Sequence, residues 1–199
     1  MCNRYVSPQE AAIERLWQIG RHNNNPWRGG SVFPRGQGPF IRRGRHDSGY
    51  GLELAIGQWG LIPWFAKSPK LAYSTNNARS EELASKASFR DPWARGQRCI
   101  IPADSFDEPC WETGKNVWVD KATGEEVESY TMLTVNADAH PIMSRMHKPD
   151  PKLPPDQQDK RSVIAIELED VDLWLQGTID QARALLQPPA PEVFEPRST

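Results

Sequence analysis

Residues 52–65 read LELAIGQWGLIPWF, and this stretch determines much of the fold that we expect. Apolar and polar residues alternate over residues 52–62, which is the pattern of a strand that buries one face. Gly60 and Pro63 then favour a turn at the end of the strand. Three aromatic residues crowd this turn, namely Trp59, Trp64 and Phe65. Such crowding is most often core packing, but it can also present ring faces to a ligand.

Further elements are expected on both sides of this strand. Residues 8–20 have the apolar spacing of a helix, with Ser7 as the N-cap and Gly20 as the stop. Residues 168–187 predict one or two terminal helices that begin at an acidic turn. Four other stretches predict extended chain, namely residues 40–42, 98–103, 130–137 and 162–166. We expect most of one sheet to be assembled from these strands.

Length and composition narrow the class of protein. The chain has 199 residues, which is enough for one well-buried core, so we expect one domain. Neither a membrane span nor a signal peptide is present in the sequence, so we expect a cytoplasmic protein with no membrane partner. The formal net charge of −2 argues against nucleic-acid binding by bulk attraction.

The cysteines favour neither a disulfide framework nor a metal site. Cys2, Cys99 and Cys110 form no CxxC pair, and their number is odd. A zinc site that adds His147 to these three cysteines fails on the spacing of its ligands. We therefore expect no metal and no cofactor.

Positive charge is concentrated in one stretch of the chain. Residues 23–51 are rich in Asn, Gly, Pro and Arg, which predicts an irregular loop. Its arginines are Arg28, Arg35, Arg42, Arg43 and Arg45. They supply a local positive potential that the net charge lacks, although a solvated loop explains the charges equally well. Beside this loop, rings of the aromatic turn could stack on unpaired bases, for about 1–3 kcal/mol each.

The second residue has a chemistry that no internal cysteine has. Cysteine is small enough for Met1 to be trimmed, which would leave Cys2 with a free amine beside its thiol. The amine, with a reference pKa of about 7.7–8.0, can form an imine with an aldehyde, and the thiol can then close a five-membered thiazolidine. A cysteine at position 2 can also be incidental, so the interpretation depends on other residues.

Three polar residues are candidates for the same site. Asn77 lies in residues 74–81, STNNARSE, which we expect to form a tight turn before a helix, and its amide could orient a nucleophile or could simply cap that helix. Glu108 follows the strand at residues 98–103, and it could be a desolvated acid and base or a surface carboxylate. His147 follows an apolar strand, where a loop could bring it to a site, although a lone histidine is usually structural.

Taken in order, these motifs resemble one protein family. They are MCNRY at residues 1–5, WGLIPW at 59–64, NARSE at 77–81, FR at 89–90, RCIIPA at 98–103, and Glu108. The set resembles the SRAP family, the SOS response-associated peptidases that process abasic sites, from Cys2 to about residue 187. The resemblance implies one α+β domain over residues 1–187, with a curved, barrel-like, mainly antiparallel sheet flanked by short helices. Residues 188–199 would be a flexible tail.

The resemblance also implies an activity in the DNA damage response. The protein would be a monomer that binds single-stranded DNA containing abasic sites, and it would be nucleoid-associated when bound. Cys2 would form a thiazolidine crosslink to the abasic sugar, which shields the lesion. Glu108 could also serve the removal of Met1, which would explain the peptidase label, although a separate aminopeptidase could remove Met1 equally well.

Individual residues carry over by position. Cys2 matches the catalytic nucleophile, and Asn77 matches the amide that positions it. Glu108 matches the acid and base, and His147 matches the histidine that follows the strand. The expected DNA contacts are Arg4, Trp59, Trp64 and Arg79 by position, with Arg42 and Arg43 from the basic loop.

Two features depart from the family pattern. Family members carry a hydrophobic strand with a Gly-Leu-Ala-Gly-Leu-Trp-like pattern after the glutamate segment, whereas here residues 114–118 run almost directly into residues 119–124. Either the sequence omits part of the chain or this member is compromised, and a sheet edge would be exposed and core lost. The His-x-Arg-Met-Pro order is also broken after His147, which leaves His140 as a competitor.

Two other functions stay open. Mature Cys2 could attack an amide with its own amine as the base, as in N-terminal nucleophile hydrolases, but that activity leaves the Arg-rich loop and the aromatic turn unexplained. A non-enzymatic single-strand binder would use the loop and the turn. It would leave Asn77, Glu108 and His147 without a task.

Overall fold

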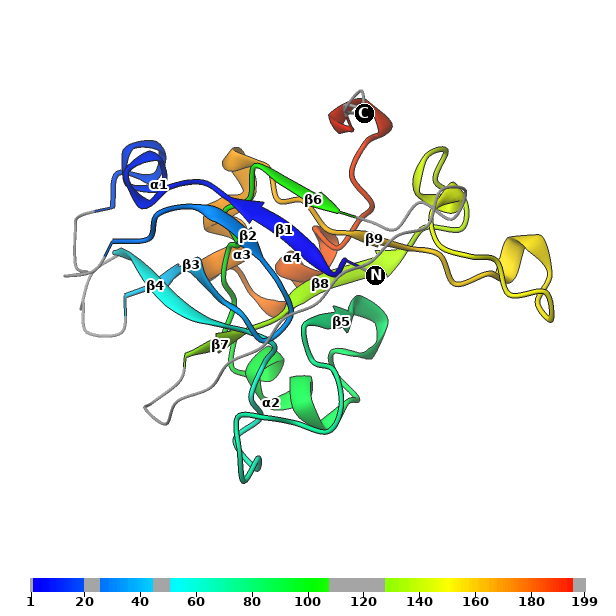
Figure 1. Ribbon diagram of the computed structural model, residues 1–199, viewed down its shortest axis with the longest axis horizontal. Coiled ribbons are helices and arrows are strands. Elements are labelled where there is room, and N and C mark those ends of the chain that lie inside the picture. Colours follow the sequence, from blue (N-terminus) through cyan, green and yellow to red (C-terminus); the bar gives the residue numbers. More distant parts are fainter. Residues whose placement is uncertain (1, 20–25, 45–50, 108–127, 195–199) are drawn as a thin grey trace.

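The strands of the described chain form three small sheets. The computed structural model describes residues 2–19, 26–44, 51–107 and 128–194. The first sheet has the order β2-β1-β6, and Figure 1 shows β1 between its two neighbours, close to the amino terminus. Its strands are β1 (Arg4–Ser7), β2 (Gly30–Val32) and β6 (Ser105–Asp107). β1 pairs with a strand on each side, antiparallel in both cases, so it is the central strand of this sheet.

The second and third sheets each contain one parallel pair. Their strands are β3 (Gln37–Arg43), β4 (Leu52–Trp59), β7 (Ser129–Tyr130), β5 (Asn77–Arg79), β8 (Met132–Asn136) and β9 (Arg161–Val163). In the second sheet β4 pairs antiparallel with β3 and parallel with β7. In the third sheet β8 pairs parallel with β5 and antiparallel with β9. Only Thr131 separates β7 from β8, so one stretch of chain passes from the second sheet to the third.

Short helices flank the sheets. The α-helices of the described residues are α1 (Glu10–Trp17), α2 (Ala87–Ala94), α3 (Val171–Gln176) and α4 (Ile179–Ala184). Single 3-10 turns link other elements, namely η1 (Ser80–Glu82), η2 (Met143–Arg145), η3 (Pro155–Gln157), η4 (Leu168–Asp170) and η5 (Pro191–Val193). No helix in the described ranges is long and apolar enough to cross a membrane.

Two large apolar clusters make up most of the core. The first cluster contains Cys2, Tyr5, Val32, Phe40, Trp59, Tyr130, Met132 and Val163. The second cluster contains Ala78, Leu83, Trp93, Val171, Trp174, Leu175, Ala182 and Leu186. Apolar side chains from all three sheets and from the terminal helices are thereby removed from water, which is the main favourable term in folding. Because Cys2 belongs to the first cluster, the candidate nucleophile is part of the core.

The expected α+β fold with short flanking helices is confirmed, but the expected sheet is not. The described strands form three separate sheets rather than one curved, barrel-like sheet, and they close no barrel. The physical reason lies in the pairing partners. Before Thr131 the chain forms β7, which pairs with β4, and after Thr131 it forms β8, which pairs with β5. No single ladder therefore continues from one sheet into the next.

Several predicted elements have different bounds from those expected. Ser7 lies in β1 and does not cap α1, which follows Gln9 and ends where Gln18 adopts a left-handed conformation. The predicted strand at residues 98–103 is reduced to one bridge, between Ile100 and Ile41, because the rest of this segment has no ladder partner among the described strands. Asn77 begins a short strand instead of lying in a turn.

Candidate active site around Cys2

Cys2 lies two residues before β1 and has contacts on several sides. The residue is fully buried and packs in the first core cluster with Tyr5 and Trp59. Its thiol donates a hydrogen bond to the main-chain oxygen of Arg4, at 3.1 Å. While Met1 is attached, the nitrogen of Cys2 is part of a peptide bond, so removal of Met1 is required before this nitrogen can act as an amine.

Two neighbouring asparagines approach the carbonyl oxygen of Cys2. Asn77 donates from Nδ2 to this oxygen at 2.8 Å, which brings together two of the residues expected at the site. Asn76 donates to the same oxygen at 3.4 Å. The Oδ1 atom of Asn77 is buried and accepts no hydrogen bond from the described residues. The sequence did not single out Asn76, although two consecutive asparagines were a signal for a second amide at the site.

Strand β6 ends one residue before the candidate acid and base in the sequence. This strand ends at Asp107, which pairs with Arg4 in the register of the first sheet. Glu108, the next residue in the sequence, lies outside the described residues. The chain that leads to Glu108 therefore runs beside the strand that begins two residues after Cys2.

The two candidate histidines have different surroundings. His140 is buried, its Nδ1 accepts hydrogen bonds from the main-chain nitrogens of Ile142 and Met143, and its Nε2 bonds to the oxygen of Pro189 at 2.9 Å. Both ring nitrogens of His140 are therefore committed to structure. His147 is half-buried and follows η2, and its main-chain oxygen accepts from Nζ of Lys160 at 2.5 Å. His147 thus stays the better candidate.

Other titratable groups of the first cluster are unsuited to acid or base chemistry. The hydroxyl groups of Tyr5 and Tyr130 share a hydrogen bond, and burial raises the pKa of both phenols above their usual value. Burial likewise raises the pKa of the Cys99 thiol to about 12, so Cys99 stays protonated and is a poor nucleophile at neutral pH. This leaves Cys2 as the better candidate of the two described cysteines.

The two tryptophans expected to contact DNA have opposite environments. Trp59 is fully buried in the first cluster, where its ring packs edge-on against Tyr5 with centroids 5.1 Å apart. A ring buried on both sides cannot stack on a base, so the expectation for Trp59 is corrected. Trp64 is 75% exposed, packs against Phe65, and donates from Nε1 to Asp91 at 2.9 Å.

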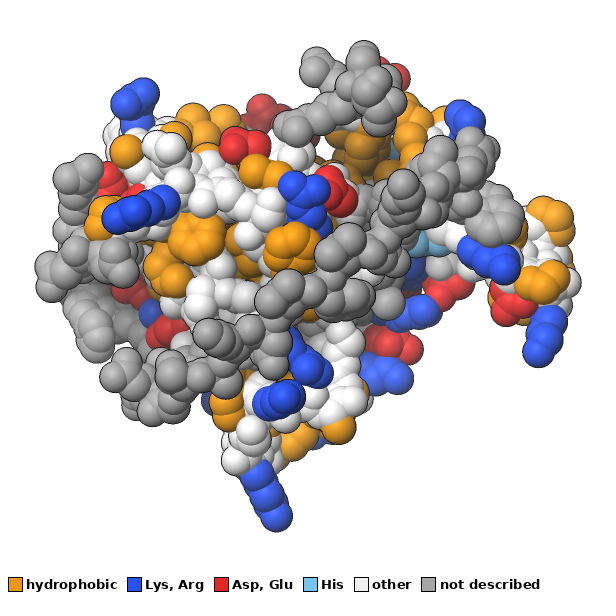
Figure 2. Space-filling view, in the orientation of Figure 1, with side chains coloured by type: hydrophobic (Ala, Val, Ile, Leu, Met, Phe, Trp, Pro, Cys, Tyr) orange, Lys and Arg blue, Asp and Glu red, His pale blue; other side chains and the backbone are white. Residues whose placement is uncertain are grey.

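The four arginines expected to contact DNA are not equally available. Arg42 is mostly buried and pairs with Glu53 and Glu128, at 2.5 and 2.8 Å. Arg4 and Arg79 are partly exposed but pair with Asp107 and Asp159 respectively. Arg43 is exposed and has no ion pair with a described residue. On the face in Figure 2, Lys and Arg side chains lie singly or in small groups, some of them beside acidic side chains, and the described residues there form no continuous basic stripe.

Comparison with known proteins supports the family. The sequence matches the family described as SOS response associated peptidase (SRAP) over residues 1–117, which is more than half of the chain. The chain belongs to the SRAP family.

Relatives of this SRAP chain carry an abasic-site label. One is the abasic site processing protein YobE of Bacillus subtilis, 59% identical over 51 residues, which are 26% of this chain and 23% of YobE. Another is the abasic site processing protein HMCES of Gallus gallus, 34% identical over 83 residues, or 38% of this chain and 24% of HMCES. The matched region is therefore about a quarter of the length of each relative.

Solved structures share the SRAP chain's fold over almost its whole length. A crystal structure of a Bordetella bronchiseptica protein has a TM-score of 0.75 and 29% identity, and the match covers 96% of both chains. A Bacteroides thetaiotaomicron protein is similar in fold alone, with a TM-score of 0.67, 20% identity, and coverage of 96% of this chain and 89% of that one.

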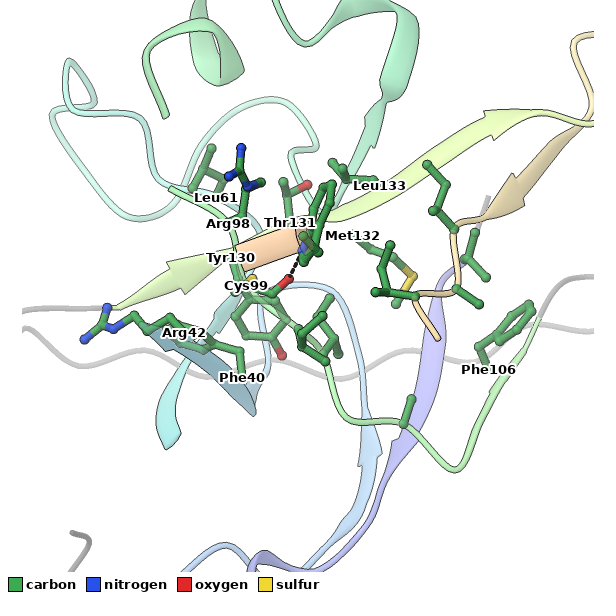
Figure 3. Close-up of a pocket in the computed structure, with 18 of the residues that line it drawn as sticks. Phe40, Arg42, Leu61, Arg98, Cys99, Phe106, Tyr130, Thr131, Met132 and Leu133 are labelled. Carbon is green, nitrogen blue, oxygen red and sulfur yellow. Dashed lines mark hydrogen bonds between the residues drawn. The ribbon is translucent and has the colours of Figure 1, made fainter. Parts of the chain in front are cut away.

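One large cavity of the SRAP chain is lined by described residues that do not include the candidate catalytic residues. It has a volume of about 1390 Å³ and is lined mainly by apolar side chains of the two core clusters, and Figure 3 shows Cys99, Tyr130 and Thr131 at its wall. Cys2, Asn77 and His147 are not among the lining residues described. The size of a cavity alone therefore does not locate the candidate site. The apparently missing strand falls at residues 114–124, which lie outside the described residues.

Proposed function

We propose that this SRAP protein forms a covalent thiazolidine crosslink between Cys2 and an abasic site in single-stranded DNA, once Met1 has been removed. The observation that carries the proposal is the hydrogen bond from Asn77 to the carbonyl oxygen of Cys2, at 2.8 Å. It fixes the residue that bears both nucleophiles, and fixed geometry of reacting groups is a large source of rate enhancement. The abasic-site label of the relatives supports the choice of substrate.

The reaction can be written with every atom accounted for. The ring-opened abasic sugar presents an aldehyde, and the free amine of Cys2 adds to its carbon to give a carbinolamine. The hydroxyl takes a proton from an acid and leaves as water, which yields a protonated imine. The thiol gives its proton to the resulting base, its sulfur adds to the imine carbon, and the ring nitrogen keeps its own hydrogen. The product is a five-membered thiazolidine, and no oxidant or cofactor is needed.

Three side chains are assigned to the proton transfers of this reaction. Glu108 protonates the departing hydroxyl of the carbinolamine and takes the thiol proton, as a general acid and base. His147 assists opening of the sugar ring or reversal of the link. The unpaired Oδ1 of Asn77 is an acceptor for the amine or the carbinolamine hydroxyl next to Cys2.

Among the aromatic residues that the structure describes, Trp64 is the best suited to stack on an unpaired base, since its ring is the most exposed. Replacing Trp64 by alanine is expected to weaken binding of single-stranded DNA about 5- to 150-fold, the equivalent of one lost base–aromatic contact of about 1–3 kcal/mol. Fluorescence anisotropy with a labelled oligonucleotide measures the affinity. Leu168→Ala is the matched control, because Leu168 is also an exposed apolar side chain, and it should bind normally. Equal affinities for the Trp64 variant and the wild type would contradict the assignment.

The proposed function is tested with mature protein and one oligonucleotide in two forms. Protein lacking Met1 is incubated with single-stranded DNA carrying one abasic site, and with the same strand intact. We expect an adduct that survives heat and denaturant only with the abasic strand, and a mass increase on the peptide that begins at Cys2. Absence of any such adduct from protein whose Met1 is verified as removed overturns the proposal.

A cysteine hydrolase acting on amides is the second candidate for the same residue. The amine of Cys2 would then be a base instead of a nucleophile. Turnover of amide substrates in the absence of DNA, with no adduct on abasic DNA, would favour the hydrolase. The exposed ring of Trp64, and the exposed Arg43 that has no ion pair with a described residue, favour the DNA reaction, because hydrolysis of an amide requires neither.

A further inference from the structure

A chain of hydrogen bonds leads to Cys2 through three residues that have no task in the proposed function. We propose that Ser74, Asn76 and Trp59 are positioning residues that hold Cys2 for reaction, and that Trp59 acts through this chain and not by contact with DNA. The inference rests on the proposed function, since it concerns the reactivity of Cys2. We call these three residues the positioning chain.

Asn76 is the member of the positioning chain that contacts Cys2. It is only 4% exposed, and its Nδ2 donates to the carbonyl oxygen of Cys2 at 3.4 Å. The hydroxyl of Ser74 donates to Oδ1 of Asn76. This contact fixes which end of the amide faces Cys2, because the oxygen is engaged by Ser74 and only the nitrogen is left as a donor. Ser74 itself is exposed, so its hydroxyl can be removed without opening the core.

Trp59 anchors the main chain of Asn76. The indole Nε1 donates to the main-chain oxygen of Asn76 at 2.9 Å, and the nitrogen of Met132 donates to the same oxygen at 2.8 Å. The main chain of Trp59 is in turn bonded to that of Gly36 and Arg35, at 2.8 and 2.7 Å. The fully buried indole is therefore rigid, and it transmits its position to Asn76 through one hydrogen bond.

Two amide donors on one carbonyl oxygen restrict Cys2 more than one donor does. Asn77 and Asn76 belong to the same segment, and both amides converge on this oxygen. Fixing the oxygen fixes the peptide plane that follows Cys2 and so limits the directions open to its amine. A reacting group keeps a productive geometry only when neighbouring residues restrain it. The positioning chain supplies this lock.

The test separates DNA affinity from the rate of crosslinking. Affinity is measured with a single strand containing a tetrahydrofuran abasic analogue, which has no aldehyde, and the rate constant is measured with saturating abasic strand. Trp59→Phe keeps an apolar ring but loses the donor, and Ser74→Ala loses the hydroxyl. We expect each to slow crosslinking about 3- to 10-fold, as for one lost hydrogen bond, and to leave DNA affinity within about 2-fold.

Rescue and charge controls distinguish positioning from general damage to the fold. Ser74→Thr retains a hydroxyl and should restore the wild-type rate. Asn76→Asp loses the donor and should slow crosslinking about 10-fold or more. Gln176→Glu makes the same change from amide to acid on the exposed surface of α3 and should have no effect.

Two outcomes overturn the inference. One is a Trp59→Phe protein with weakened affinity for the analogue and an unchanged rate constant, which would mean that the ring contacts DNA after all. The other is a Ser74→Ala protein that reacts at the wild-type rate. If the wild type forms no DNA adduct, condensation of Cys2 with glycolaldehyde, followed by mass spectrometry, compares the same variants. The positioning chain is then judged independently of the proposed function.

Discussion

Replacing Cys2 by alanine is expected to abolish the heat-stable adduct with abasic single-stranded DNA. Alanine keeps the amine but has no sulfur, so the reaction stops at an imine, which water reverses. The adduct is measured on a denaturing gel at saturating DNA. Borohydride, which reduces imines, should restore a covalent product in this variant, and this result would show that the amine still reaches the aldehyde.

Two companion proteins make the Cys2 result specific. Cys99→Ala should form the adduct normally, because the raised pKa of Cys99 keeps its thiol protonated and the residue has no free amine. An extension that keeps residue 2 in a peptide bond should abolish both the stable adduct and the product trapped by borohydride. A Cys2→Ala protein that still gives the wild-type yield of heat-stable adduct would exclude the thiazolidine.

Arg161→Ala is expected to lower the free energy of unfolding by about 2–3 kcal/mol. The guanidinium is only 5% exposed and binds Glu81 at 2.8 Å. It also donates to the main-chain oxygen of Thr134 at 2.8 Å, and so it joins β9, β8 and the turn after β5. The partner carboxylate is 49% exposed and can be solvated when Arg161 is removed, which keeps the loss below that for a fully buried pair.

Urea denaturation measures this loss against a surface control. Arg183 pairs with Asp180 at 3.7 Å and is 58% exposed, so Arg183→Ala should cost less than about 0.5 kcal/mol. Equal losses in the two variants would mean that the pair of Arg161 with Glu81 contributes no more than an ordinary surface pair.

The pair of Arg161 with Glu81 should also make the free energy of unfolding depend on pH in the acid range. Burial raises the pKa of Glu81, but the hydrogen bond from Arg161 and those from main-chain nitrogens outweigh it and hold the pKa at about 2, below the ordinary 4.5. A carboxyl group whose pKa is lowered by folding stabilises the protein above its unfolded pKa, and this contribution is lost as the pH falls towards its folded pKa. The wild type should therefore lose more stability between pH 4.5 and 2 than Arg161→Ala does.

Sequence patterns predicted the helices and strands that depend on the residues within the segment itself. The alternation over residues 52–62 predicted β4, and the apolar spacing over residues 168–187 predicted α3 and α4. Whether an extended segment joins a sheet depends instead on a pairing partner far away in the sequence, which such patterns do not reveal. Residues 98–103 look like a buried strand, yet only Ile100 finds a partner, in Ile41.

Burial and ion pairing explain the differences at the candidate site. Trp59 and Trp64 stand in the same aromatic turn, and nothing in the sequence separates the buried ring from the exposed one. Arg42 was expected in an Arg-rich loop but lies in β3, and Glu128, 86 residues away, pairs with it. Asn77 and Cys2, which the motifs placed at one site, do meet in the structure. The contacts of Asn76 with Ser74 and Trp59, on which its proposed role depends, could not be predicted from the motif.

The central place of β1 in its sheet also decides how the thiol of Cys2 is released to solvent. In most proteins the first residues of a chain fray, and groups there react quickly with added reagents. Here β1 is paired on both sides, with Arg4 opposite Asp107 on one side and Tyr5 opposite Val32 on the other, so freeing the segment breaks two ladders together. Alkylation of Cys2 in the chain that retains Met1 would thus follow large, cooperative openings and not local fraying. The thiol is then a built-in reporter of how often the native sheet opens.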